Sequence, residues 1–198
     1  MEIQTERLII RLFTAADKDI QALYEILSDE VVNQYLPLSP LQNIQEAETY
    51  YAERVLPMYQ NNAGYYLAIC LKENNLPIGY VTVSLGEGHD FGYALKKEFW
   101  GNGYVTEAGH AVIAELKDTG LKYITATHDI LNTASGRVMQ KLGMIYQYSY
   151  KEQWQPKDIL VTFRMYQLNL DDKKDRVFKK YWNMYAEHFV EDISDPGR

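Results

Sequence analysis

The spacing of hydrophobic and polar residues changes repeatedly along this chain, and each spacing predicts a type of secondary structure. Alternating or continuous apolar runs bounded by turn-forming residues predict strands, and apolar residues three or four positions apart predict amphipathic helices. The expected strands are residues 7–12, 65–71, 78–85, 89–95, 123–128, 144–154 and 158–170. The expected helices are residues 15–28, 44–58, 104–119 and 133–142.

Turn and cap residues indicate how these segments connect. Polar turns at 73–75 and 86–88 separate three successive strands, which predicts an antiparallel meander. Thr14 and Asn132 are suitable caps for the helices that follow them, and Gly120 and Gly143 are suitable helix ends. The meander is therefore expected between two helical regions.

The composition changes after residue 170. Residues 171–176 are all charged, and an aromatic-rich stretch follows in which Val177, Tyr181, Met184 and His188 fit helical spacing. We therefore predict a main domain over residues 1–170 and a C-terminal helical appendage over residues 171–198. The aromatic residues fit two interpretations: packing back on the same domain, or contact in a homodimer, since aromatic side chains are enriched in interface cores.

Overall composition narrows the class of protein. The 198 residues, 46% hydrophobic and 24% charged, are typical of one globular domain. No apolar run approaches the roughly 18 residues of a membrane span, and no signal-peptide pattern is present, so we expect no membrane partner. The net charge of -7, without clustered Lys and Arg, argues against a nucleic-acid partner. Cys70 is the single cysteine and lies in a strand-like run, which favours a buried hydrophobe in a cytoplasmic protein.

A pair of glycines indicates an anion site. Gly101 and Gly103 follow a predicted strand and precede a predicted helix. Glycines there permit backbone conformations that direct several free N–H groups at one point, and the helix dipole adds to the attraction for an anion. A phosphate or pyrophosphate is the expected occupant. The segment matches neither a P-loop nor the full dinucleotide-binding pattern.

Several motifs together resemble one enzyme family. These are Trp-Gly-Asn-Gly-Tyr at 100–104 with Thr-Glu-Ala at 106–108, Asn-Thr-Ala-Ser-Gly-Arg-Val at 132–138, Lys-Leu-Gly-Met at 141–144, Thr-Glu-Arg-Leu-Ile-Ile-Arg at 5–11 and Phe-Gly-Tyr-Ala-Leu at 91–95. In combination they are similar to the GNAT superfamily of N-acetyltransferases, and within it to the ribosomal-protein N-acetyltransferase-like branch. The resemblance covers most of residues 1–170. It implies an α+β GNAT fold with a mixed, mostly antiparallel sheet that is splayed in the middle, and helices on both faces.

The resemblance also implies acetyl-CoA as co-substrate, lying in the splay. Its pantetheine arm would run along the strand before the glycine pair, its pyrophosphate would meet backbone amides of the glycine loop, and Asn132 and Ser135 would contribute from the second motif. The implied CoA-binding residues are Tyr93, Ala94, Leu95, Trp100, Gly101, Asn102, Gly103, Tyr104, Val105, Thr106, Asn132 and Ser135.

Direct transfer from a thioester to an amine needs a proton acceptor and a group that stabilises the departing thiolate. Many relatives use a tyrosine for the thiolate, but Met139 stands in that region here, and the resemblance implies Ser135 instead. A cap-like hydroxyl satisfied by backbone is the alternative for Ser135. The candidate bases are Asp90, then Glu152, then His89, each of which is alternatively a surface group. His110, His128 and His188 lack the spacing of a metal site, and none is expected.

The predicted function is N-acetyl transfer from acetyl-CoA to a primary amine, either of a small molecule or of a protein N-terminus. The alternative is a non-catalytic acyl-CoA-binding or interaction module on the same fold. The residues give no code for the acceptor, because fold alone does not specify a substrate.

Overall fold

The computed structural model describes residues 2–193, and its strands form two antiparallel sheets. The first sheet has the order β1-β2-β3-β4-β5, with β1 at Glu2–Gln4, β2 at Leu8–Leu12, β3 at Gly64–Leu71, β4 at Pro77–Ser84 and β5 at Phe91–Leu95. The second has the order β6-β8-β7-β9, with β6 at Tyr123–Asp129, β7 at Ile145–Trp154, β8 at Ile159–Asn169 and β9 at His188–Phe189. The predicted meander is the run from β3 to β5.

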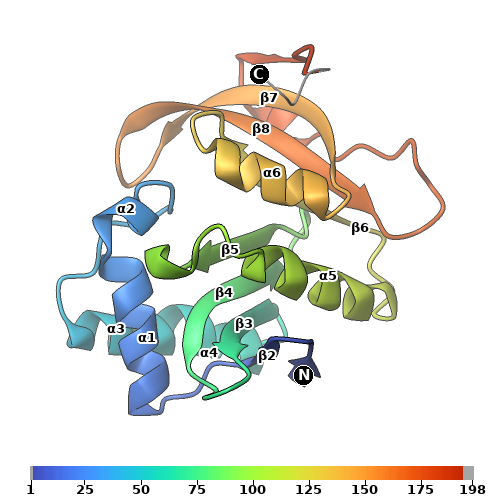
Figure 1. Cartoon of the computed structure of the whole chain (residues 1–198). Coiled ribbons are helices and arrows are strands. Elements are labelled where there is room, and N and C mark those ends of the chain that lie inside the picture. The colour runs from blue at the N-terminus through green and yellow to red at the C-terminus, as the bar shows by residue number, and fades with distance from the viewer. Residues whose placement is uncertain (1, 194–198) are drawn as a thin grey trace.

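The two sheets separate between β5 and β6. At the base of the separation Asp90 forms a parallel bridge with Thr125, whose amide donates to the carbonyl of His89 at 3.2 Å. Beyond that point the strands diverge, and Figure 1 shows the second sheet standing apart from β4 and β5. The predicted mixed α+β fold with a splayed sheet is therefore confirmed.

Helices cover both faces of the first sheet (Figure 1). One face carries α1, α3 and α4, and the other carries α5. The helices are α1 at Asp17–Ser28, α2 at Glu30–Asn33, α3 at Ile44–Tyr50, α4 at Leu56–Gln60, α5 at Tyr104–Lys117, α6 at Thr133–Lys141 and α7 at Lys180–Met184. A π-helical turn, η1 at Tyr51–Val55, joins α3 to α4, and a 3-10 turn, η2 at Lys97–Phe99, follows β5. Over residues 2–193, no helix combines the length and the apolar character that crossing a bilayer requires.

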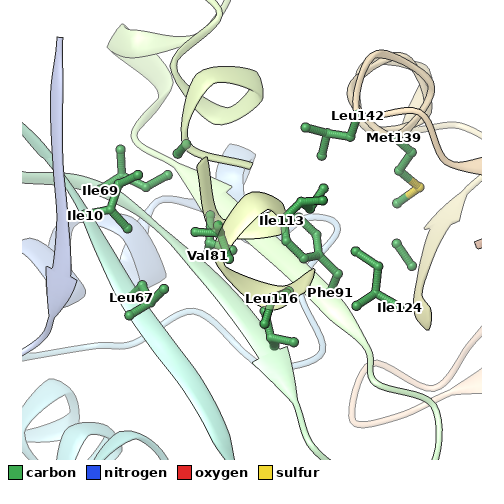
Figure 2. Close-up of a cluster of buried hydrophobic side chains, with 14 of the residues drawn as sticks. Ile10, Leu67, Ile69, Val81, Phe91, Ile113, Leu116, Ile124, Met139 and Leu142 are labelled. Atoms are coloured by element: carbon green, nitrogen blue, oxygen red, sulfur yellow. The ribbon is translucent and has the colours of Figure 1, made fainter. Parts of the chain in front are cut away.

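The main core connects the two sheets through α5. Figure 2 shows Ile113 and Leu116 of α5 between strand residues of the first sheet and Met139, Leu142 and Ile124 from α6 and β6. These side chains are almost completely buried. Burial of a large apolar side chain stabilises a fold by about 1.5–3 kcal/mol, so this shared cluster fixes α5 and α6 beside the splay.

The start of α1 differs from the prediction. Ala16, not Thr14, occupies the N-cap, and its side chain makes no capping bond. Thr14 instead donates its amide and its hydroxyl to Asp19, at 2.8 and 2.9 Å. Asp19 has a fully buried side chain and receives two bonds from Arg11, at 2.7 and 2.8 Å. The need to satisfy this buried carboxylate determines where the hydroxyl points.

The C-terminal segment is less helical than predicted. α7 spans only Lys180–Met184, after which Tyr185 is extended and His188 lies in β9. The competing interaction is strand pairing, because β9 aligns with Ser149 and Tyr150 of β7. Aromatic residues of this segment pack on the second sheet, in agreement with the interpretation that it folds back on its own domain. Residues 194–198 of the predicted appendage lie outside the described residues.

Cys70 lies within β3 and is completely buried, as predicted. It belongs to the cluster between α1 and the first sheet. Burial raises the pKa of its thiol to about 11, so at neutral pH the side chain is a neutral apolar group.

Candidate active site

A cleft of about 880 Å³ occupies the splay between the sheets. Residues from β5, the loop before α5, the start of α6 and the outer parts of β7 and β8 line it. The predicted site residues that line the cleft are Asp90, Tyr93, Ala94, Leu95, Trp100, Gly101, Gly103, Tyr104, Val105, Thr106, Asn132, Ser135 and Glu152. Asn102 and the third candidate base, His89, do not line it.

The side chain of Asn102 stabilises the glycine loop by bonding to its backbone. Its side-chain amide donates to the carbonyls of Phe99 and Trp100, at 3.2 and 3.1 Å. Its own carbonyl accepts from the Arg7 guanidinium at 2.9 Å. Local backbone acceptors take the side-chain amide of Asn102, so the expected contact of Asn102 with a pyrophosphate is through its backbone amide and stays a prediction.

The two glycines are required by backbone conformation. Gly101 and Gly103 both have φ of +78°, in the left-handed region that side chains disfavour. A Cβ added at Gly101 would meet nothing within 4 Å, so space alone would admit another residue. Gly103 is the N-cap of α5 and provides no side-chain capping bond, so the first amides of α5 have no partner within the helix. These amides, at the positive end of the helix dipole, are suited to bind an anion.

A brace of hydrogen bonds from the turn between β1 and β2 holds this loop in place. Glu107, in the first turn of α5, accepts from the Thr5 hydroxyl at 2.6 Å and from Arg7 Nε at 2.7 Å. The Arg7 guanidinium also lies 4.4 Å from the centre of the Tyr104 ring. Burial opposes ionisation of Glu107, but the hydrogen bonds from Thr5 and Arg7 lower its pKa, so it stays charged. The brace neutralises an acidic residue that would otherwise repel an anion at the helix start.

The free edge of β5 faces the splay. Ser84 N–H donates to the Asp90 carbonyl at 2.9 Å and Lys96 N–H to the Ile78 carbonyl at 2.8 Å, which fixes the hydrogen-bonded register with β4. Alternate residues of an antiparallel edge strand turn their backbone groups away from the partner. The N–H and C=O of Tyr93 consequently point toward the splay, where an extended ligand arm can pair with them.

The start of α6 brings Ser135 next to Tyr93. Asn132 caps α6 as predicted, with its side-chain oxygen accepting from the Ser135 amide at 3.1 Å. The Tyr93 hydroxyl lies 2.8 Å from Ser135 Oγ and 2.9 Å from the Ser135 carbonyl. A phenol has one proton, so when Tyr93 donates it to the carbonyl, the Ser135 hydroxyl donates to the phenol oxygen. Burial raises the pKa of Tyr93 well above that of an ordinary tyrosine, and the phenol stays protonated. Met139 is buried in the core and takes no part.

The three candidate bases have different surroundings. Asp90 is exposed to solvent in the cleft, yet the protein around it desolvates the carboxylate in part and raises its pKa to about 6. Glu152 lines the same cleft from β7. His89 packs its ring against Tyr123, with centroids 5.1 Å apart, and is not among the residues that line the cleft. Asp90 combines a position in the cleft with a raised pKa, which suits a general base.

Two sets of cleft residues were missed by sequence reasoning. The hydroxyl of Tyr93 was overlooked, since only the backbone of this residue was considered. Tyr181 and Tyr185 line the cleft from the C-terminal segment, which was regarded as an appendage. Their spacing of four residues indicated a shared face, but no local signal tells which surface that face meets.

Comparisons with known proteins agree with this geometry. The profile of the "Acetyltransferase (GNAT) domain" family matches residues 7–145. The uncharacterized N-acetyltransferase YnaD of Bacillus subtilis (strain 168) is 30% identical over 156 residues, which cover 77% of this chain and 87% of YnaD.

Two solved structures share the fold. One is the acetyl transferase of Salmonella typhimurium that modifies the N-terminal serine of ribosomal protein L7/L12, with a TM-score of 0.74 and 15% identity over 86% of this chain and all of that one. The other is the microcin C7 self-immunity acetyltransferase MccE in complex with acetyl-CoA and AMP, with a TM-score of 0.72 and 19% identity over 83% of this chain and 93% of that one. The predicted likeness to ribosomal-protein acetyltransferases and the predicted use of acetyl-CoA are confirmed. The chain therefore belongs to the GNAT family of acetyltransferases, which take their acetyl group from acetyl-CoA.

Proposed function

We propose that this chain acetylates the primary amine of a small molecule, with the residues of the splay in specific roles. The amides of residues 101–106 hold the pyrophosphate, and the backbone of Tyr93 pairs with the pantetheine arm. Ser135 and Tyr93 act at the sulfur, and Asp90 acts at the amine. One observation carries the proposal. A single cleft contains the uncapped start of α5, the hydroxyl pair of Tyr93 and Ser135, and the Asp90 carboxylate with its raised pKa.

The shape and chemistry of the cleft fit acetyl-CoA. Free amides at the start of α5 suit its pyrophosphate, and the exposed edge of β5 suits the amide groups of its extended arm. Arg137 and Lys141 of α6 also line the cleft and supply positive charge for phosphate groups. An uncharged loop with two left-handed glycines allows close approach of the pyrophosphate to the backbone.

In the transfer step, each proton that moves has a defined acceptor, and one bond forms as another breaks. Asp90 accepts a proton from the substrate ammonium, directly or through water, and leaves a neutral amine. The amine nitrogen forms a bond to the thioester carbonyl carbon, the carbon–sulfur bond breaks, and the nitrogen releases its second proton to solvent, so that one amide N–H remains. Ser135 donates its proton to the departing sulfur and is reprotonated by Tyr93, 2.8 Å away. The proton on Asp90 then returns to Tyr93 through solvent, and the site is restored.

A paired substitution tests the cofactor site. Gly103→Asp would place a carboxylate against the pyrophosphate, so calorimetry should detect no acetyl-CoA binding. Gly120→Asp is the matched control, because Gly120 also has a left-handed φ, of +83°, with nothing within 4 Å of an added Cβ, but lies beyond the end of α5. Undiminished affinity in Gly103→Asp would overturn the assignment of the loop.

Thiol release from acetyl-CoA in the presence of amines tests transfer itself. Turnover with a small primary amine supports the proposal, whereas binding without any turnover would assign the chain to the alternative class of non-catalytic acyl-CoA-binding modules. A cytoplasmic location, independence of nucleic acids and a homodimer contact stay predictions from the sequence.

A further inference from the structure

The C-terminal segment after β8 is anchored to the second sheet at several points. Phe178 donates its amide to Gln167 at 2.8 Å, and its carbonyl accepts from the Tyr148 hydroxyl at 2.8 Å. Farther along, Glu191 pairs with Arg164 at 2.5 and 3.1 Å. The intervening residues, including α7, are therefore held against β7 and reach the cleft in a fixed position.

Two tyrosines of this segment form a stack with β7. The Tyr150 ring lies 5.0 Å from that of Tyr181 at an interplanar angle of 20°, and 4.8 Å from that of Tyr185 at 10°. Tyr150 is almost completely buried, while the other two rings are partly exposed. All three line the cleft, together with Trp154 and Phe163. One end of the cleft thus has a wall of parallel aromatic rings.

Both tyrosines of the segment line the same cleft as the carboxylates of Asp90 and Glu152, and their pKa values respond to those carboxylates. Burial, and then a hydrogen bond to the Glu152 carboxylate, raise the pKa of Tyr185 to about 12. Burial, and then the charge of nearby Asp90, raise the pKa of Tyr181. The aromatic wall and both carboxylates therefore belong to one chamber, defined by Asp90, Tyr150, Glu152, Tyr181 and Tyr185, which we call the acceptor chamber.

The charged side chains of the cleft lie on different elements: Asp90 and Glu152 belong to the acceptor chamber, and Asp129, just before α6, accepts from the Leu131 amide at 2.9 Å. Among the described residues that line the cleft, the cationic side chains are Arg137 and Lys141, and both lie on α6. The nearest lysine of the β7–β8 hairpin, Lys157, donates to the carbonyls of Asn33 and Gln34 at 2.5 and 3.1 Å. An ammonium group would find two carboxylates and aromatic rings in the acceptor chamber, where the neighbouring cation Lys157 is held by these carbonyls and lies 5.3 Å from the centre of the Trp154 ring.

The same lysine encloses the chamber. By bonding to the end of α2 and the residue after it, Lys157 joins the β7–β8 hairpin to the opposite wall, which contains Tyr35 and Leu36. Figure 1 shows the hairpin of β7 and β8 reaching toward α2. A closed wall of this kind fits a compact ligand better than a polypeptide.

We propose that the acceptor chamber selects small primary amines carried on a flat aromatic body, whose ring packs on the Tyr150–Tyr185 wall while the nitrogen faces Asp90. This inference rests on the proposed function and specifies its substrate class. The C-terminal segment is then part of the substrate site, because it supplies two of the three stacked rings.

A matched pair of amines tests the class. 2-Phenylethylamine and 2-cyclohexylethylamine have the same chain and similar size, but only the first has a planar π-system. Aromatic stacking contributes about 0.5–1.5 kcal/mol beyond simple burial, so kcat/KM at equal free-base concentration should be about two- to tenfold higher for the phenyl compound. Equal rates, a preference for the cyclohexyl compound, or a preference for a short peptide with a free N-terminus would overturn the proposal.

Substitutions at Tyr185 test the role of the segment. Tyr185→Ala removes a ring, and the KM for 2-phenylethylamine should rise about three- to tenfold while that for 2-cyclohexylethylamine changes less. Tyr185→Phe keeps the ring, removes the bond to Glu152 and should preserve the preference for the phenyl compound. An equal change of KM for both amines in Tyr185→Ala would contradict stacking on this wall.

Acetyl-CoA affinity, measured by calorimetry on the same proteins, separates the two proposals. Loss of aromatic preference with acetyl-CoA binding and transfer intact would refute only the substrate class. Absence of acetyl-CoA binding in the unsubstituted protein would refute the proposed function.

Discussion

Replacing Asp90 by Asn removes the proposed base while keeping a side chain of nearly the same size at the base of the splay. The unsubstituted carboxyl has a pKa of about 6 because protein surrounds it within the cleft. It is protonated and inactive as a base below this value, and ionised above it. Activity should therefore rise with pH through the region near 6 in the unsubstituted protein, and the substitution should remove that rise.

The pKa determines the size of the effect. With a value of about 6, the carboxylate is about 90% ionised at pH 7 and about 10% ionised at pH 5, so its contribution falls about tenfold between them. A positioned general base contributes about 100-fold or more to a rate, which is the expected loss in Asp90→Asn at pH 7. The ammonium of the acceptor titrates in both proteins, so the ratio of their kcat/KM values isolates Asp90.

The assay is thiol release from acetyl-CoA between pH 5 and 8 with a saturating amount of acetyl-CoA. Glu152→Gln is the matched control, since it removes the second carboxylate of the acceptor chamber. A constant ratio between Asp90→Asn and unsubstituted protein across this range would refute the assignment of Asp90. If Glu152→Gln abolished the rise instead, Glu152 would be the base.

Three further substitutions test other parts of the structure. Tyr93→Phe and Ser135→Ala should each lower kcat about tenfold or more with little change in the KM for acetyl-CoA, because the hydroxyls act only as the sulfur departs. An unchanged kcat in Ser135→Ala would exclude Ser135 from the mechanism. Asp19→Ala should lower the free energy of unfolding in urea by about 3 kcal/mol or more, because it leaves Arg11, only 12% exposed, without its partner. Burial opposes ionisation of Asp19, but hydrogen bonds from Arg11 and Thr14 outweigh it and lower the pKa. The stabilisation is therefore present at neutral pH and is lost as the pH falls below the ordinary aspartate value. A decrease in the free energy of unfolding of less than about 1 kcal/mol in Asp19→Ala would show that the pair contributes little.

The elements with strong periodicity could be predicted from the sequence. The helix at α5 and the strands from β3 to β8 were expected within a few residues of their observed bounds, because α5 buries one consistent face and the strands are apolar or alternating runs bounded by turn residues. β1 and β9 were missed, since they have three and two residues and exist through pairing with β2 and β7. Pairing partners of this kind are a property of the tertiary fold and leave no local pattern.

The same distinction holds for the candidate site, where features that are adjacent in sequence could be predicted and long-range contacts could not. The anion loop could be predicted because glycine chemistry and the following helix are adjacent in sequence. The contact between Tyr93 and Ser135 and the brace between Arg7 and Glu107 could not, as these partners are 42 and 100 residues apart. The aromatic character of the C-terminal segment was visible, but its place in the acceptor chamber depends on how α7 and β9 dock on β7.

The burial of Cys70 has a practical consequence for every kinetic test described above. A chain with a single cysteine, whose thiol is completely buried and has a pKa of about 11, presents almost no thiolate to a reagent in its native state. A colorimetric thiol reagent would report only free CoA, without background from the enzyme and without inactivating it. The same reagent would detect Cys70 on unfolding, so a slow rise of signal in the absence of an amine would measure global opening of the first sheet.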